Sequence, residues 1–171
     1  MESKAVDFVI RGEGVVSLHL LAEAVKKGGA YDSIPGLVFR RKDGTLHINP
    51  PAGMKHSDDH PLPATDLLHQ RFYRRNKRAA MVIVAGRGCP MTCSYCSVGA
   101  SSYLKYYKRS VTSVIDEIQC NVNQYDVGFI DFEDENLSLD RRWFLKLLAE
   151  INRRFSTNEP ELRAMNGLYP P

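Results

Sequence analysis

The sequence predicts an α/β fold in which a parallel sheet or barrel makes up the second half of the chain. From residue 81 onward, short apolar segments typical of strands alternate with longer segments whose apolar residues recur at helical spacing. This alternation is typical of βα units, in which each helix crosses over between two parallel strands. The 171 residues are 43% hydrophobic and 25% charged, an ordinary composition for a globular protein.

The first part of the chain, residues 1–48, is expected to form a small α/β piece. A strand, a helix and a hairpin of two strands follow one another there, at residues 6–10, 16–27, 36–40 and 45–48. Gly28 and Gly29 end the helix, since glycine is the usual residue just past a helix C-terminus. On this helix we expect one apolar face, made by Val16, Leu20, Ala24 and Val25, with Leu21 beside it.

Residues 49–80 are expected to form a linker, because four prolines interrupt a mostly polar stretch. Within it, residues 71–78 are basic and include two aromatic side chains. We interpret this run as a solvated connector, although contact with RNA or with acidic groups is the alternative. The net charge of +3 is too small to indicate a nucleic-acid partner.

The third part, residues 81–171, carries the predicted βα units. Three strands and two helices are expected, with strands at residues 81–85, 127–132 and 162–165, and helices at residues 111–123 and after an N-cap at Asp140. A (β/α) barrel uses about 30 residues per unit, so this part holds roughly three strands of one. Cys120 falls on the first helix and is interpreted as a small apolar residue.

Three cysteines lie in one short loop, GRGCPMTCSYC, directly after the first of these strands. Cys89, Cys93 and Cys96 supply three soft thiolate ligands in a C-x3-C-x2-C spacing. A 4Fe–4S cluster held by three thiolates has one open iron, and an open metal position is where chemistry occurs. The alternatives are a zinc site, which has no fourth Cys or His at the usual spacing, and a redox pair of Cys93 and Cys96, which leaves Cys89 unexplained.

The cysteine loop closely resembles that of the radical S-adenosylmethionine (SAM) superfamily. The segments VDFVIRGEGVVSLHLLAEAV, IPGLVFRRKDGTLHINP and HPLPATDLL are similar to members that carry a Rossmann-like cobalamin-binding domain before the barrel. The resemblance implies that residues 1–48 are the C-terminal remnant of that domain, that residues 49–80 are the linker, and that residues 81–171 are the N-terminal half of a partial radical-SAM-type barrel. We therefore expect a fragment that is truncated at both ends.

The resemblance also implies the site. Cys89, Cys93 and Cys96 match the cluster ligands, and contacts to SAM fall to one aromatic, three acidic and one basic residue: Tyr95, Glu133, Asp134, Glu135 and Arg109. The aromatic position lies near the SAM adenine, and an acidic residue after the second strand accepts from the SAM ammonium. The sequence does not choose among the three acids, because the usual Gly-Gly-Glu of the family is not present. Arg109 either reaches the SAM carboxylate or is a charge at a helix start.

The function implied is a radical SAM enzyme that cleaves SAM to a 5′-deoxyadenosyl radical, with cobalamin-dependent methyl transfer as the leading reaction and with catalytic residues unknown. The Asp-x-His-x-x-Gly pattern that contacts cobalamin in the family is missing, so cobalamin is expected for a full-length parent rather than for this chain. The alternatives are a non-catalytic iron–sulfur or zinc module left by truncation, and a methylthiotransferase-like enzyme that modifies RNA.

The expected partners are a small-molecule substrate and a reductant such as flavodoxin or ferredoxin, with neither nucleic acid nor a membrane. No apolar run approaches the roughly 18 residues that span a bilayer. The chain has four cysteines, three of them clustered, which is typical of the reducing cytoplasm rather than of a secreted disulfide scaffold.

Overall fold

The computed structural model describes residues 5–51, 58, 60–69, 71, 73–98, 106–157 and 160–168, together with the backbone of residues 99 and 100. The chain divides into two compact units. The N-terminal unit is Met1–Lys55 with Ala100–Leu104, and the C-terminal unit is His56–Gly99 with Lys105–Pro171. Within the described residues, no helix is both long and apolar enough to cross a membrane.

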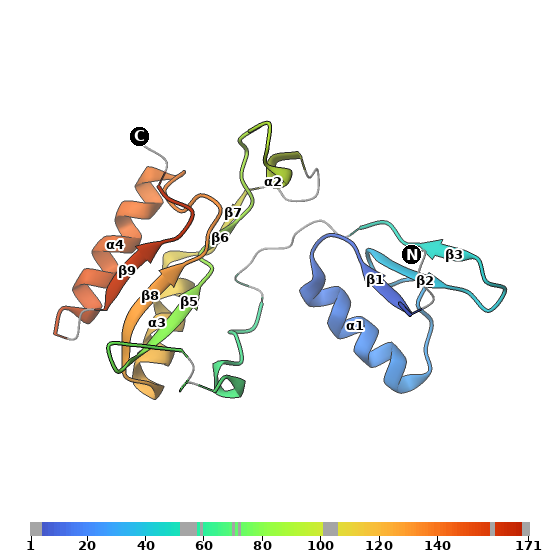
Figure 1. Cartoon of the computed structure of the whole chain (residues 1–171), viewed down its shortest axis with the longest axis horizontal. Helices are drawn as coiled ribbons and strands as arrows, with labels where there is room; N and C mark the ends of the chain where they lie inside the picture. The colour runs from blue at the N-terminus through green and yellow to red at the C-terminus, as the bar shows by residue number, and fades with distance from the viewer. Residues whose placement is uncertain are drawn as a thin grey trace. The chain divides into compact units, whose positions relative to one another are not determined.

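The N-terminal unit contains a three-stranded sheet and one helix (Figure 1). Its elements are β1 (Phe8–Ile10), α1 (Gly14–Lys27), β2 (Leu37–Arg40) and β3 (Leu46–Ile48). The strands follow the order β1-β2-β3, and both pairings are antiparallel. The predicted strands, helix and hairpin are thus confirmed. The assignment to a Rossmann-like domain, in which parallel strands dominate, stays a prediction.

The predicted apolar face of α1 is confirmed only in part: Leu21 is buried and Ala24 packs against the same small core, but two of the predicted residues are exposed. Ser17 and Leu21 are the buried residues of this helix, whereas Leu20 is 39% and Val25 is 54% exposed. The Ser17 hydroxyl donates to the Pro35 carbonyl at 2.7 Å, so a small polar side chain occupies the close approach between the helix and the turn before β2. Periodicity did not reveal this face, because apolar residues occur on every side of α1.

The C-terminal unit contains a four-stranded sheet in the order β4-β5-β8-β9. The strands are β4 (Arg74–Arg75), β5 (Arg78–Ile83), β8 (Val127–Phe132) and β9 (Glu161–Ala164). The pairs β5–β8 and β8–β9 are parallel, which confirms the predicted βα units. The three parallel strands β5, β8 and β9 are too few to show whether the sheet would close into a partial barrel, so the barrel stays a prediction.

Two parts of the predicted linker are regular: the short 3-10 helix η2 (Thr65–Leu67) and a hairpin. The strands β4 and β5 form an antiparallel hairpin, and Asn76 and Lys77 between them have positive φ angles of 50° and 68°. Because Asn is one of the residues that tolerates a left-handed conformation, this two-residue turn suits a hairpin. The strand β5 therefore begins at Arg78, three residues before the predicted start, and ends at Ile83.

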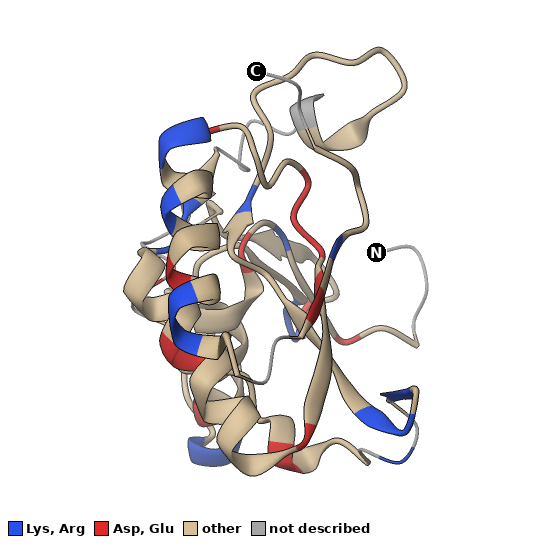
Figure 2. Cartoon of the chain, turned by 90° about the vertical axis from the view of Figure 1, so that its left-hand side faces the viewer, with Lys and Arg blue, Asp and Glu red and all other residues tan. Residues whose placement is uncertain are grey.

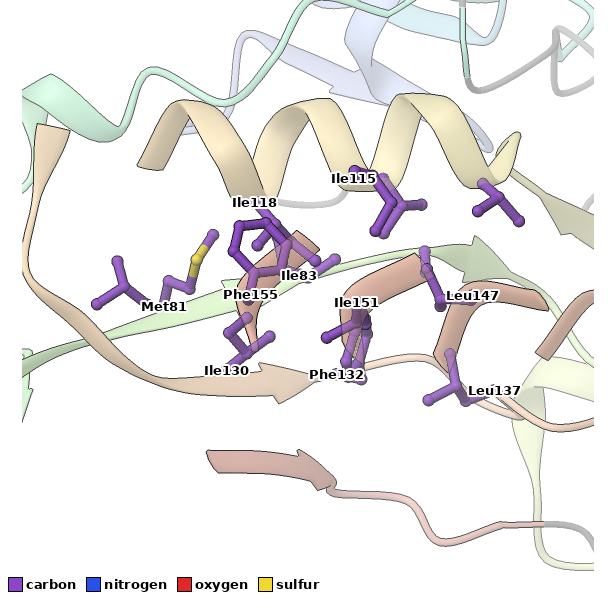
Figure 3. Packing of buried hydrophobic residues seen from close by; sticks show 14 of the residues in the cluster. Met81, Ile83, Ile115, Ile118, Ile130, Phe132, Leu137, Leu147, Ile151 and Phe155 are labelled. Carbon is purple, nitrogen blue, oxygen red and sulfur yellow. The ribbon is translucent and has the colours of Figure 1, made fainter. Parts of the chain in front are cut away.

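Two amphipathic helices pack on one face of this sheet. The helix α3 (Val111–Gln124) begins after an N-cap at Ser110, and α4 (Arg141–Phe155) after the predicted N-cap at Asp140. Successive right-handed crossovers that add strands in one direction place their helices on the same face. Figure 3 shows side chains from both helices meeting those of β5 and β8 in the core. The opposite side of α4 carries mainly basic positions (Figure 2).

The face of the sheet away from these helices carries charged as well as apolar residues. In register across the three parallel strands lie Val82, Asp131 and Arg163. The Arg163 guanidinium pairs with the Asp131 carboxylate and lies 5.3 Å from the centre of the Phe129 ring. This face stands in contrast to the apolar core on the helix side.

Candidate metal-cluster and cofactor site

The candidate site lies where β5 and β8 end, because the carboxyl ends of adjacent parallel strands meet at one edge of a sheet. Ile83 and Phe132 are paired in register, and the Glu133 amide donates to the Ile83 carbonyl at 3.0 Å. The chain beyond β5 leads to Cys89, and the chain beyond β8 carries the three acidic residues. Two segments that are about 50 residues apart in the sequence are thereby neighbours.

A short two-stranded ribbon forms the base of the cysteine loop. The strands β6 (Gly86–Arg87) and β7 (Tyr107–Lys108) pair antiparallel, so the chain leaves the sheet at Arg87 and returns beside it. A Cβ atom at Gly86 would lie 2.7 Å from the Tyr107 carbonyl oxygen. Only glycine fits this approach. Neither strand was predicted from the sequence, since a strand of two residues carries no periodicity.

Asp134 is turned toward the backbone that follows β5. It is 4% exposed, and its Oδ2 accepts a hydrogen bond from the Ala85 amide at 3.1 Å. The Gly86 amide is a second donor to the same carboxylate. Burial outweighs these hydrogen bonds and raises the pKa of Asp134 to about 6.

Glu135 contacts the same loop one step further along. Its Oε2 accepts from the Gly88 amide at 3.0 Å, directly before Cys89. Glu133 has a different environment, because its side chain is exposed, and its one interaction given for the described part of the chain is an electrostatic attraction to Arg163 that is longer than an ion pair. Of the three predicted acids, two therefore hold the cysteine loop and one faces solvent.

Arg109 lies at the start of α3 and is committed to contacts within the fold. Its guanidinium pairs with the buried Glu117 and donates to the Val84 carbonyl at 3.2 Å. It also donates to the Ser113 carbonyl at 3.1 Å and to the Ser113 hydroxyl at 2.9 Å. This placement corresponds to the helix-start alternative, and a contact with the SAM carboxylate would require several of these bonds to break.

The three cysteines are free thiols. Cys93 is exposed, Cys89 and Cys96 are half-buried, and the Cys96 amide donates to the Cys93 carbonyl at 3.0 Å in a turn. Tyr95 lies in that turn and is 91% exposed, so it does not pack against the sheet. The short helix α2 (Ser97–Ala100), which was not predicted, follows the last cysteine.

The donor set of this loop fits an iron–sulfur cluster by its chemistry, since three unpaired thiols on one anchored loop are the ligands that such clusters take. The positions of the three cysteines relative to one another are, however, not those of a metal site. Among the residues that the structure describes, no three His, Cys, Asp or Glu side chains are gathered closely enough to hold a metal ion. The cysteine assignments accordingly stay predictions.

No family model matches the chain. The chain is 30% identical over 153 residues to the "Uncharacterized methyltransferase PH0819" of Pyrococcus horikoshii, covering 89% of this chain and 33% of that protein. It is 31% identical over 159 residues to the anaerobic magnesium-protoporphyrin IX monomethyl ester cyclase of Rubrivivax gelatinosus, covering 90% and 28%. The chain thus spans about a third or less of these relatives.

Two solved structures are similar in fold. The radical S-adenosylmethionine methyltransferase TsrM from Kitasatospora setae, with cobalamin and a 4Fe–4S cluster bound, has a TM-score of 0.66 and 24% identity, covering 92% of this chain and 33% of that one. The cobalamin-dependent S-adenosylmethionine radical enzyme OxsB has a TM-score of 0.64 and 19% identity, covering 92% and 22%. At these identities the likeness establishes the fold.

Proposed function

We propose that this chain, which is related to the radical SAM enzymes that carry a cobalamin-binding domain, binds a 4Fe–4S cluster through Cys89, Cys93 and Cys96 and binds SAM at the open iron. The observation that carries the proposal is the C-x3-C-x2-C set of free thiols on a loop that begins at the carboxyl edge of the parallel sheet. When bound and reduced, such a cluster supplies the electron that cleaves SAM to methionine and a 5′-deoxyadenosyl radical.

Among the acidic residues, Glu133 is proposed as the acceptor for the SAM ammonium. Its side chain is exposed at the carboxyl end of β8, whereas Asp134 and Glu135 accept backbone hydrogen bonds from the cysteine loop. An exposed carboxylate can bind an incoming ammonium without first losing a hydrogen bond. Tyr95 is proposed to contact the adenine, because its ring is exposed in the same loop and offers a free face for stacking.

Methyl transfer is the reaction that we propose for the whole protein. Three of the relatives are named methyltransferase or methylase, and three are named a cyclase, so the reaction after SAM cleavage varies among them. One solved TsrM structure holds tryptophan as substrate, in line with a small molecule as the substrate class. Cobalamin would be bound by parts of a longer protein, and a flavodoxin or ferredoxin would supply the electron.

A second candidate is a metal-binding module that does not turn over SAM. It would use the same three thiols, with a fourth ligand in the position that SAM would otherwise occupy. The two candidates differ in whether the metal retains an open position, because a closed four-ligand site is structural.

The test is anaerobic reconstitution with iron and sulfide, followed by electron paramagnetic resonance of the reduced chain with and without SAM. The proposal predicts a 4Fe–4S signal that shifts when SAM is added. Cys93→Ala should abolish it, whereas Cys120→Ala, the matched control on α3, should leave it unchanged. Glu133→Gln should weaken SAM binding by roughly tenfold, as expected for loss of a charge-assisted hydrogen bond.

A cluster signal that ignores SAM would favour the metal-binding module. Tetrahedral zinc in place of iron, or a signal that survives Cys93→Ala, would refute the cluster assignment.

A further inference from the structure

We infer that Asp134 and Glu135 are positioning residues that fix the base of the cysteine loop, and that they are not ligands of SAM. The inference rests on the proposed function only for the identity of the metal group. The contacts themselves belong to the fold, because they join the segments that follow β5 and β8.

Asp134 holds the first residues after β5. Backbone amides at the end of a strand lose their ladder partners and need other acceptors when they are buried. The Asp134 carboxylate meets this need for the Ala85 amide, at 3.1 Å, and for the Gly86 amide. Gly86 approaches so closely that an added Cβ would lie 3.2 Å from the Asp134 Oδ1. A carboxylate engaged in this way could turn to a ligand only by leaving two buried amides unpaired.

Glu135 holds the peptide that leads into the first cysteine. Its Oε2 lies 3.0 Å from the Gly88 nitrogen, and Gly88 has a φ of +78°, which only glycine adopts readily. This turn sets the direction in which the chain enters Cys89. The carboxylate therefore fixes the loop at the residue immediately before a predicted ligand.

The same segment is also joined to β9. The Asn166 side-chain amide donates to the Asp134 carbonyl at 3.0 Å, and the Met165 amide donates to the Phe132 carbonyl at 3.2 Å. The carboxyl ends of β5, β8 and β9 are thus connected through residues 132–135. Outer residues that orient metal ligands commonly change metal affinity by about 10- to 100-fold when they are substituted.

The experiment compares Glu135→Ala and Glu135→Gln with the matched control Glu133→Ala, which removes a neighbouring carboxylate that does not touch the loop. Amide hydrogen exchange is measured first in the metal-free full chain. Glu135→Ala should speed exchange of the Gly88 amide by about tenfold or more, and Glu135→Gln should restore the slow rate because its amide oxygen still accepts. Asp134→Asn should speed exchange at Ala85 or Gly86, because an Asn side chain offers one acceptor oxygen where the carboxylate serves two amides. Exchange at Ile130, in the core of β8, reports whether each variant is folded.

The second readout is the reconstituted cluster. Glu135→Ala should lower iron affinity in a chelator competition by about tenfold and broaden the electron paramagnetic resonance signal, with both effects reversed in Glu135→Gln. The inference would be overturned if Glu135→Ala left the Gly88 exchange rate and the electron paramagnetic resonance signal unchanged but weakened SAM binding. If the wild-type chain takes up no cluster, the proposed function fails, while the exchange rates still decide the positioning role.

Discussion

The three consecutive acidic residues after β8 carry the same functional group but differ in how far each is buried. Glu133 faces solvent, whereas Asp134 is 4% exposed and Glu135 is half-buried against the Gly88 amide. All three follow Phe132, the last residue of β8, which is in register with Ile83 at the end of β5. At the residue scale, burial therefore separates a candidate ligand from two residues that hold the loop.

The buried Asp134 predicts a pH dependence of stability. Its pKa is raised by burial from 3.8 to about 6, so the folded chain binds this proton more tightly than the unfolded chain. The stabilising contribution is full below pH 3.8 and is lost as the pH rises through 6. Between pH 4 and pH 7 we expect the free energy of unfolding of the wild type, relative to Asp134→Asn, to fall by about 2 kcal/mol.

Urea denaturation of both proteins across this pH range measures the effect, and taking the difference removes the titration of the other acids. Fluorescence of Trp143, the single tryptophan of the chain, reports on the C-terminal unit. A difference that stays constant from pH 4 to pH 7 would show that Asp134 ionises normally in the folded chain.

At the scale of elements, the ribbon of β6 and β7 depends on one glycine. A methyl group at Gly86 would meet the Tyr107 carbonyl oxygen at 2.7 Å, and because this atom is backbone of the paired strand β7, little adjustment is possible. We expect Gly86→Ala to lower the free energy of unfolding of the C-terminal unit by about 1–3 kcal/mol, the usual range for overpacking. Trp143 fluorescence during urea denaturation of the wild type and of Gly86→Ala measures this loss of unfolding free energy.

The control for this substitution is Gly14→Ala at the start of α1, where an added Cβ has nothing within 4 Å. It should leave the Trp143 transition unchanged. An equal result for the two variants would mean that the ribbon shifts to accept a side chain.

The regular elements of the C-terminal unit were predictable because their signals are local. The strand β8 matches its predicted residues 127–132, and Asp140 caps α4 as predicted. The strand β4 and the early start of β5 were missed because Asn76 and Lys77 are a weak turn signal beside Asn-Gly or Asp-Gly. The face of α1 was predicted only in part, with Leu21 correct and Ser17 missed, because apolar residues surround the helix.

The site was predictable only in part, for a physical reason. The cysteine spacing is local and identifies the loop, but the partners of that loop lie about 50 residues further along the chain. The bond from Gly88 to Glu135 requires the register of β5 against β8, which no local pattern specifies. For Arg109 the sequence left two roles open, and the ion pair with Glu117, eight residues later on α3, corresponds to the helix-start role.

At the scale of the whole molecule, the two units have separate hydrophobic cores of unequal size. Among the residues that the structure describes, the core of the N-terminal unit consists of Leu21, Ile34, Leu37 and Phe39, whereas fifteen buried residues form the core of the C-terminal unit. Small cores remove a smaller fraction of apolar surface from water and leave a smaller net stability. Each unit should therefore open with its own free energy.

Native-state amide hydrogen exchange tests this expectation. The amides of Val38 and Phe39 lie on β2, the central strand of the N-terminal sheet, and those of Ile83 and Ile130 lie on β5 and β8. We expect the β2 amides to exchange through openings of lower free energy than the β5 and β8 amides, since the protection of a strand is limited by the stability of the unit that contains it. The same highest free energy at all four amides would instead show that the chain unfolds as one cooperative block. In that case, the four-residue core would have to be stabilised by contacts outside its own unit.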